Sequence, residues 1–142
     1  MKDLQFLYSL AERNNISVIK FNLPLTESMS IQSGSDCYIG IDYKQIADQA
    51  SERVHLAHEL GHCITGSFYN RHSKADIRQR HENRADKWAI SKLVSEDELD
   101  QAVADGHTEL WDLAEHFGVS EEFMKKSVCF YTYGNVAAEL YF

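Results

Sequence analysis

The stretch His58-Glu59-Leu60-Gly61-His62 constrains this chain more than any other part of its sequence. Two histidines four residues apart lie on the same side of a helix, one turn from each other, so their neutral imidazoles can bind one zinc ion together. Glu59 lies about 100° further round the helix, where it can hold a water molecule next to the metal. This H-E-x-x-H spacing is typical of zinc hydrolases in which the glutamate is the general base.

The residues around the motif predict a helix with two different faces. One face can enter the core while the other lines a cleft. The residues expected on the core side are Leu56, Ala57, Leu60 and Ile64. Ser51 is expected to cap the beginning of this helix, and Gly66 is expected to end it. His55 precedes His58 by one turn, too far along the helix for the same metal ion, and is expected in the cleft wall or on the surface.

A catalytic zinc site usually has three protein ligands and one open position. The metzincin pattern requires a histidine where this chain has Phe68, which excludes that class of peptidase. The alternative is a glutamate on a later helix, and Glu82 is the best candidate, on a helix expected from residue 80 to residue 93. Asp86, one turn further on the same face, could accept the free ring N–H of a ligating histidine. His81 is the alternative third ligand.

The charge of the chain is unevenly distributed. The net charge is −8, yet residues 1–95 hold 12 basic and 11 acidic side chains, whereas residues 96–142 hold 2 basic and 11 acidic ones. Because this acidic half would repel a phosphate backbone, no direct nucleic-acid partner is expected. Residues 113–126 resemble a helix-turn-helix, but Glu121 and Glu122 would begin its second helix, so a helical corner packed on the core is expected. The acidic half is expected either to attract a basic protein or to keep a helical surface solvated.

Hydrophobic spacing and turn residues predict an α+β fold in a single domain, residues 1–142, with a small, mostly antiparallel sheet and a helical C-terminal half. Before the H-E-x-x-H helix, the expected elements are a helix at 3–13, a strand at 16–21, and two strands at 29–32 and 37–41 around a hairpin-type turn. Residues 67–79 are expected to form a surface loop. Trp88 and Trp111 are expected to be core aromatics.

Three cysteines, Cys37, Cys63 and Cys129, are odd in number and widely spaced. They are interpreted as small packing residues in a reducing compartment, because they form no visible disulfide framework or cysteine zinc pattern. No apolar run approaches the roughly 20 residues needed to span a bilayer. The N-terminal residues lack the apolar core of a signal peptide. A cytoplasmic protein without a membrane partner is therefore expected.

Two motifs together resemble the ImmA/IrrE family of metallopeptidases. Members of that family carry an R-x-x-x-A-H-E-x-x-H helix followed by an E-x-x-A-D-x-(aromatic)-A helix. Residues 53–62 of this chain match the first motif and residues 82–89 match the second. The likeness extends over roughly residues 35–127. The paired motifs are far more specific than H-E-x-x-H alone.

The resemblance implies that His58, His62 and Glu82 bind zinc and that Glu59 is the general base. Family members with known roles cut DNA-binding repressors in bacteria, phages and mobile elements, and this chain resembles the short form associated with phages and integrative elements. The implied function is a zinc-dependent endopeptidase that cleaves a helix-turn-helix repressor. Two alternatives stay open: a non-hydrolytic binding module that holds its partner, such as an anti-repressor, and a toxin–antitoxin component with a structural zinc ion.

Peptide hydrolysis also requires a donor that stabilises the oxyanion of the tetrahedral intermediate. The sequence contains several side chains that could supply it, and no spacing selects among them. These candidates are His72, His107, His116, Tyr69, Tyr131 and Tyr133.

Overall fold

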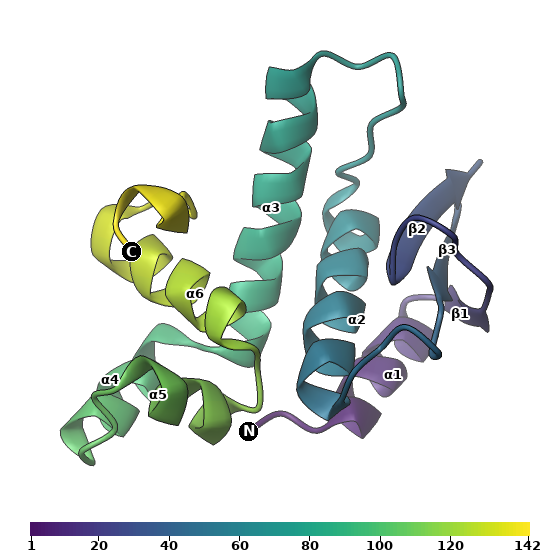
Figure 1. Ribbon diagram of the computed structural model, residues 1–142. Helices are drawn as coiled ribbons and strands as arrows, with labels where there is room; N and C mark the ends of the chain where they lie inside the picture. The colour runs from purple at the N-terminus through teal and green to yellow at the C-terminus, as the bar shows by residue number, and fades with distance from the viewer.

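A three-stranded sheet and six α-helices make up the chain, whose residues 1–142 the computed structural model describes (Figure 1). The elements are α1 Leu4–Arg13, β1 Ile16–Lys20, β2 Ser28–Ser33, β3 Asp36–Ile41, α2 Gln49–Thr65, α3 Ala75–Leu93, α4 Glu96–Ala104, α5 Leu110–Phe117, α6 Glu121–Tyr133 and a short 3₁₀ helix at Ala138–Leu140. The predicted α+β class is confirmed.

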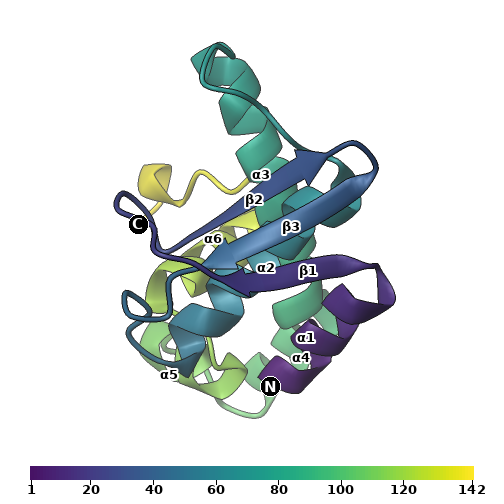
Figure 2. The ribbon, with the colours of Figure 1, turned by 90° about the vertical axis from the view of Figure 1, so that its right-hand side faces the viewer.

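The sheet is mixed, with the strand order β1-β3-β2 (Figure 2). Strands β2 and β3 form the expected antiparallel hairpin, but β1 pairs with β3 in parallel, with Ile16 opposite Cys37. The prediction of a mostly antiparallel sheet is corrected here. Residues 21–27 carry the chain from the end of β1 to the far edge of the sheet, where β2 begins. Strand β3 then returns between the other two, so β2 is left with one unpaired edge.

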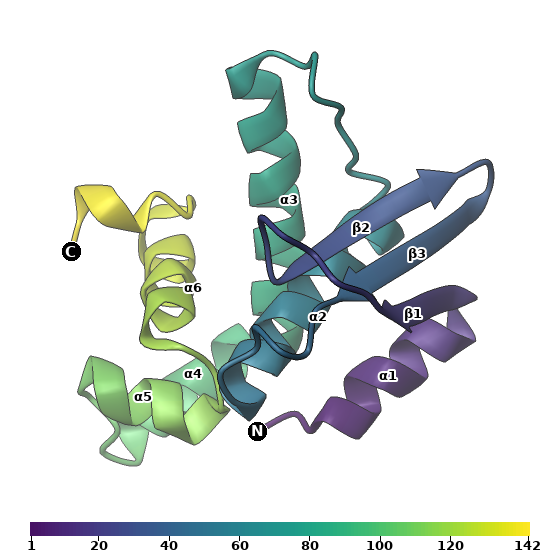
Figure 3. The ribbon, with the colours of Figure 1, turned by 45° about the vertical axis from the view of Figure 1, so that its right-hand side comes forward.

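Helix α2 lies between the sheet and α1 on one side and α3 on the other (Figure 3). Its core side contains Leu56, Ala57 and Leu60, which are fully buried as predicted. Ile64 is 38% exposed, so its predicted burial is wrong. It lies in the last turn of α2, just before the chain leaves the helix at Gly66.

Helices α2 and α3 approach each other closely at Gly61 and Ala85. A Cβ atom added to Gly61 would lie 2.6 Å from the carbonyl oxygen of Ala85 and 3.0 Å from its Cα atom. Contacts this short are with the backbone, which cannot rotate away as a flexible side chain would. The two small residues therefore set the separation of the two helices.

The observed ends of helices α2 and α3 agree only in part with those predicted from the sequence. Gly66 ends α2 in the left-handed conformation, as predicted, but the helix begins earlier than expected. Its cap is Asp48, whose side chain accepts a hydrogen bond from the Ser51 amide, so Ser51 lies inside the first turn. Helix α3 also begins earlier, at Ala75. Ala75, Arg78 and Gln79 favour a helix, but residues 75–79 stay exposed, so they show no apolar period from which this turn could be predicted.

The C-terminal half packs as the expected helical corner. Leu113 and Phe117 of α5 and Phe123 of α6 are buried in the core. Trp111, however, is 58% exposed, which corrects its predicted place in the core. It lies about 200° round the helix from Leu113, so α5 buries the leucine and turns the indole outward. Trp88 packs, partly buried, against the core.

Cys37 of β3 and Cys63 of α2 form a disulfide that joins the sheet to α2, with their Cα atoms 6.0 Å apart. The interpretation of these two cysteines as unlinked packing residues is therefore wrong. Their sequence separation of 26 residues carries no disulfide signature, since the pair forms only when α2 packs on the sheet. Cys129 is buried and free, as expected. No helix is both long enough and apolar enough to cross a membrane.

Replacing Gly61 by alanine should lower the free energy of unfolding by about 1–3 kcal/mol, because the added methyl group forces α2 away from the backbone of α3. Urea unfolding followed by circular dichroism measures this change. Ser51→Ala, in the first turn of the same helix, is the control and should change stability by less than about 0.5 kcal/mol. Equal stability of the Gly61→Ala protein and the parent chain would contradict the assigned packing.

Candidate metal centre

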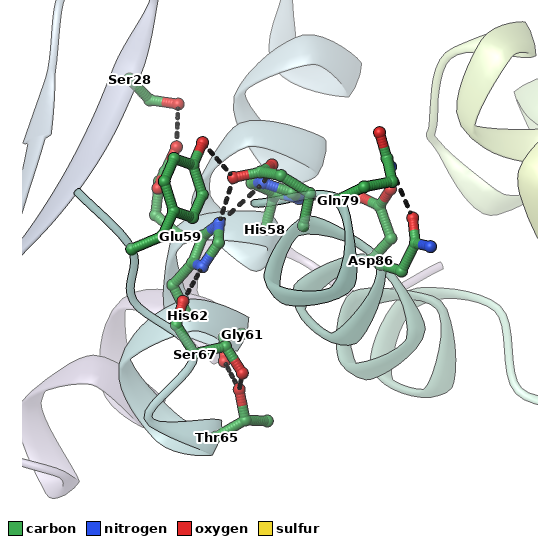
Figure 4. A network of polar contacts seen from close by, with 12 residues as sticks. Ser28, His58, Glu59, Gly61, His62, Thr65, Ser67, Gln79 and Asp86 are labelled. Carbon is green, nitrogen blue, oxygen red and sulfur yellow. Dashed lines mark hydrogen bonds and ion pairs between the residues drawn. The ribbon is translucent and has the colours of Figure 1, made fainter. Parts of the chain in front are cut away.

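The side chains of His58 and His62 on α2 and Glu82 on α3 converge at one point. Figure 4 shows the two histidines side by side on α2, with Glu59 next to them. The Nε2 atom of His58 lies 2.8 Å from Oε2 of Glu82, and the Nε2 atom of His62 lies 3.0 Å from Oε1. The two Nε2 atoms are 3.2 Å apart. One donor atom from each residue therefore faces a common centre.

The other ring nitrogen of each histidine has its own partner. His62 Nδ1 contacts the carbonyl oxygen of Ser67, which can only accept, so this nitrogen carries a hydrogen. His58 Nδ1 lies 2.8 Å from Oδ1 of Asp86. Burial opposes ionisation of Asp86, but the hydrogen bond from His58 and the nearby Lys126 ammonium hold the pKa of this carboxyl below its usual range. Both imidazoles therefore turn Nε2 toward Glu82.

This arrangement fits a metal cation. If both imidazoles are neutral, their Nε2 lone pairs and the Glu82 carboxylate face one another with no hydrogen between them, and such a cluster requires protons or a cation. Although burial opposes protonation, hydrogen bonds to Asp86 and Glu82 raise the pKa of His58 to about 10, and the two histidines in turn lower the pKa of Glu82. A bound metal ion would replace these protons. Two imidazole nitrogens and one carboxylate are a donor set of catalytic zinc sites.

Glu59 lies beside this cluster and is held by the edge strand. Its Oε2 atom accepts a 2.7 Å hydrogen bond from the hydroxyl of Ser28 on β2. Ser28 Oγ also lies 3.0 Å from Nδ1 of His55, which lines the cleft as expected. Both Ser28 and Glu59 are buried. Ser28 was not found from the sequence, because it belongs to no motif and reaches Glu59 only through the packing of β2 on α2.

Two hollows meet at the cluster. A cleft of about 500 Å³ lies between the edge of β2, helix α2 and the chain that follows α2, and its wall includes Met29, Phe68 and Tyr69. A second groove of about 550 Å³ extends toward α6 and is lined by Glu122 and other polar residues. His55, His58 and Glu82 line both. The cluster is therefore open to a ligand from two sides.

Residues 11–128 match the family model Peptidase_M78, described as the IrrE N-terminal-like domain. The chain belongs to this family. The match contains both helices of the metal cluster, and it confirms the resemblance that the two motifs indicated. Comparisons with curated proteins and with solved structures gave no match. This M78 peptidase domain thus combines the family's two-histidine helix with a glutamate, in a group that could hold a metal ion as zinc peptidases do.

The structure brings together all five residues that the sequence nominated, which are His58, Glu59, His62, Glu82 and Asp86. His81, the alternative ligand, is not part of the cluster. Its ring stacks instead on that of Tyr69, with the ring centroids 6.4 Å apart. Tyr69 donates a 2.9 Å hydrogen bond to Oε1 of Glu82. Burial and this hydrogen bond raise the pKa of Tyr69 to about 12.

Alanine substitutions at Glu82, Asp86 and His81 should affect zinc affinity to different extents. Asp86→Ala removes only the support of His58 and should cost about 10–100-fold, while Glu82→Ala removes a ligand and should cost more. His81→Ala should change affinity by less than about 3-fold, within the scatter of single-site effects. Competition with a chromophoric chelator at constant pH gives the three constants, with circular dichroism to confirm folding. A larger loss in His81→Ala than in Glu82→Ala would transfer the ligand role to His81.

Proposed function

We propose that this chain is a zinc-dependent endopeptidase that acts in the cytoplasm and cleaves a DNA-binding repressor of the helix-turn-helix class, relieving repression in a phage or mobile element. His58, His62 and Glu82 hold the zinc ion, and Asp86 orients His58. The observation that carries the proposal is the convergence of two imidazole Nε2 atoms and a carboxylate at the junction of two open grooves, with the Glu59 carboxylate beside them.

In this proposal Glu59 is the general base. A zinc ion bound at the cluster supplies Lewis acidity for the scissile carbonyl and lowers the pKa of water. Glu59 takes a proton from the attacking water and delivers it to the leaving amide nitrogen. Because Ser28 occupies Oε2 of Glu59 through its 2.7 Å hydrogen bond, the Oε1 atom remains for the proton. Ser28 thus fixes the orientation of the Glu59 carboxylate and leaves Oε1 free to accept the proton.

The geometry of the grooves supports cleavage within a chain. Strand β2 lines the main cleft with Ser28, Met29 and Ser30, and its outer edge has no partner strand. An extended substrate segment can pair with such an edge through its main chain, whatever its side chains. The second groove then accepts the residues beyond the scissile bond. A substrate that continues on both sides of the cluster suits an endopeptidase.

The charge of the C-terminal half supports a basic partner. Glu96, Asp97 and Asp100 are exposed on α4, and no salt bridge pairs any of them. A DNA-binding protein presents a basic face, and complementary charge raises the rate of association. The cytoplasmic location follows from this substrate class alone, since the Cys37–Cys63 disulfide gives no support for a reducing compartment.

Glu59→Gln should abolish hydrolysis while leaving zinc binding intact, with a loss of about 10²–10⁴-fold in rate. The assay is digestion of a synthetic peptide library by the zinc-loaded protein, read by mass spectrometry. Glu12→Gln, an exposed change on α1, is the control and should retain full activity.

The same variant separates hydrolysis from the alternatives. If repression is still relieved in cells that carry Glu59→Gln, the protein acts by holding its partner as a binding module. If the zinc-loaded parent protein cleaves no peptide and no repressor, the metal is structural, as in the toxin–antitoxin alternative.

Reversing three charges on α4, by changing Glu96, Asp97 and Asp100 to lysine, should slow association with a helix-turn-helix repressor that the zinc-loaded parent chain cleaves. The parent chain should associate more slowly as salt is added, because the Debye length falls to about 8 Å at physiological ionic strength. Stopped-flow kinetics across a salt series measures both effects. The matched control reverses three exposed carboxylates elsewhere, those of Glu12, Asp36 and Asp76. An association rate independent of salt would leave the acidic surface with solvation as its only role.

A further inference from the structure

We propose that Tyr69 is a catalytic residue whose hydroxyl donates a hydrogen bond to the oxyanion formed at the scissile carbonyl. This inference rests on the proposed endopeptidase function. Attack of water places a negative charge on the carbonyl oxygen, and peptidases stabilise that charge with a positioned donor. Glu59, Glu82 and Asp86 offer only acceptor oxygens when ionised, and the two histidines face the metal position. The donor must therefore come from another residue.

The tyrosines of α6 are occupied elsewhere. The hydroxyl of Tyr131 donates to the carbonyl oxygen of Val94 at 2.7 Å. The ring of Tyr133 stacks on that of Tyr141, with the centroids 3.9 Å apart. Neither lines the cleft at the metal cluster.

The histidines that the sequence nominated as donors are also remote from the cleft. His107 lies 2.8 Å from Asp112 and packs against the ring of His116. His72 is exposed in the loop before α3 and does not line the cleft. Of the nominated donors, this leaves Tyr69 alone in the wall of the cleft.

Tyr69 reaches the edge of the metal cluster from the chain that joins α2 to α3. Its hydroxyl donates to Oε1 of Glu82 at 2.9 Å, and its ring centroid lies 6.4 Å from that of His62. The ring of His81 stacks on the phenol ring, so the phenol is supported by α3. The side chain remains 42% exposed toward the cleft, where a substrate carbonyl would lie.

During the reaction, the Tyr69 hydroxyl can exchange its resting acceptor, Glu82, for the oxyanion. Glu82 shares its charge with His58, His62 and the cation, whereas the developing oxyanion carries a localised charge that attracts the same hydroxyl more strongly. A tyrosine has an ordinary pKa near 10 and therefore holds its proton at neutral pH. Tyr69 donates a hydrogen bond and transfers no proton. When the C–N bond breaks, the leaving nitrogen receives the proton that Glu59 took from water.

Other side chains of the cleft can also donate. The hydroxyls of Thr26 and Ser28 already donate, to the Ser28 carbonyl oxygen and to Glu59. The contacts of His55 argue against its taking this role. Its Nδ1 atom lies 3.0 Å from Ser28 Oγ, and its Nε2 atom lies 3.8 Å from Oε2 of Glu27. Both contacts direct the imidazole toward β2 and the chain before it. The geometry therefore favours Tyr69.

Tyr69→Phe removes the hydroxyl and keeps the ring that stacks on His81. With a peptide selected from the library digestion, kcat should fall by about 10²–10³-fold, the range for loss of one oxyanion donor, while KM changes by less than about 3-fold. Affinity for a phosphinic peptide of the same sequence, which mimics the tetrahedral intermediate, should fall by a similar factor. Zinc content should remain one per chain. Tyr133→Phe, a tyrosine outside the cleft, is the matched control and should change none of these quantities.

The outcomes separate this proposal from the one on which it rests. If Glu59→Gln is inactive but Tyr69→Phe keeps full kcat and full phosphinic affinity, the role of Tyr69 is refuted and the peptidase function stands. If His55→Gln loses phosphinic affinity and Tyr69→Phe does not, His55 is the donor. If Glu59→Gln remains fully active, the proposed peptidase mechanism fails and the assignment of Tyr69 fails with it.

Discussion

The near contact between the backbones of α2 and α3 at Gly61 and Ala85 determines whether His58, His62 and Glu82 can converge. Helices usually pack with their axes about 8–10 Å apart, depending on the side chains at the contact. Here a glycine between the two histidines faces an alanine between Glu82 and Asp86, and no room remains for a Cβ atom at position 61. A wider separation would move Glu82 beyond the reach of both Nε2 atoms. Gly61 and Ala85 are therefore as necessary to the convergence of the three side chains as the two histidines and Glu82 themselves.

A second set of contacts holds these helices in place from outside. Arg53, which begins the first motif, is buried, and its guanidinium donates to the carbonyl oxygens of Lys2 and Gly118. It thereby ties the beginning of α2 to both the N-terminal segment and the corner between α5 and α6. Lys126 of α6 contacts Asp86 at 3.3 Å, in the groove that His58 also lines. The helical C-terminal half thus supports the cluster, although it contributes no residue to it.

The sequence predicted the part of the site that a regular period determines. His58 and His62, or Glu82 and Asp86, are separated by four residues on one helix, so each pair was certain to share a face once the helix was assigned. Ser28 and Tyr69 come from a strand and from an irregular segment, where nothing local in the sequence indicates what they contact. The Cys37–Cys63 disulfide and the parallel pairing of β1 could not be predicted for the same reason, because both depend on how distant segments pack. Trp111 shows the converse error, since a large apolar side chain can still fall on the outer face of a short helix.

The carboxylates of Asp86, Glu82 and Glu59 lie close together but have different hydrogen-bond and charge partners. Asp86 lies between a histidine and the Lys126 ammonium, and these contacts keep it ionised and fixed in place. Glu82 lies between the two Nε2 atoms, where its charge would balance that of a bound cation. Glu59 has only the neutral Ser28 hydroxyl as a hydrogen-bond partner, so no cation of the protein is paired with it. A carboxylate that is held in position but not neutralised is the one best able to accept a proton and release it again. The three carboxylates are chemically alike, so in the proposed mechanism their different roles follow from their different partners.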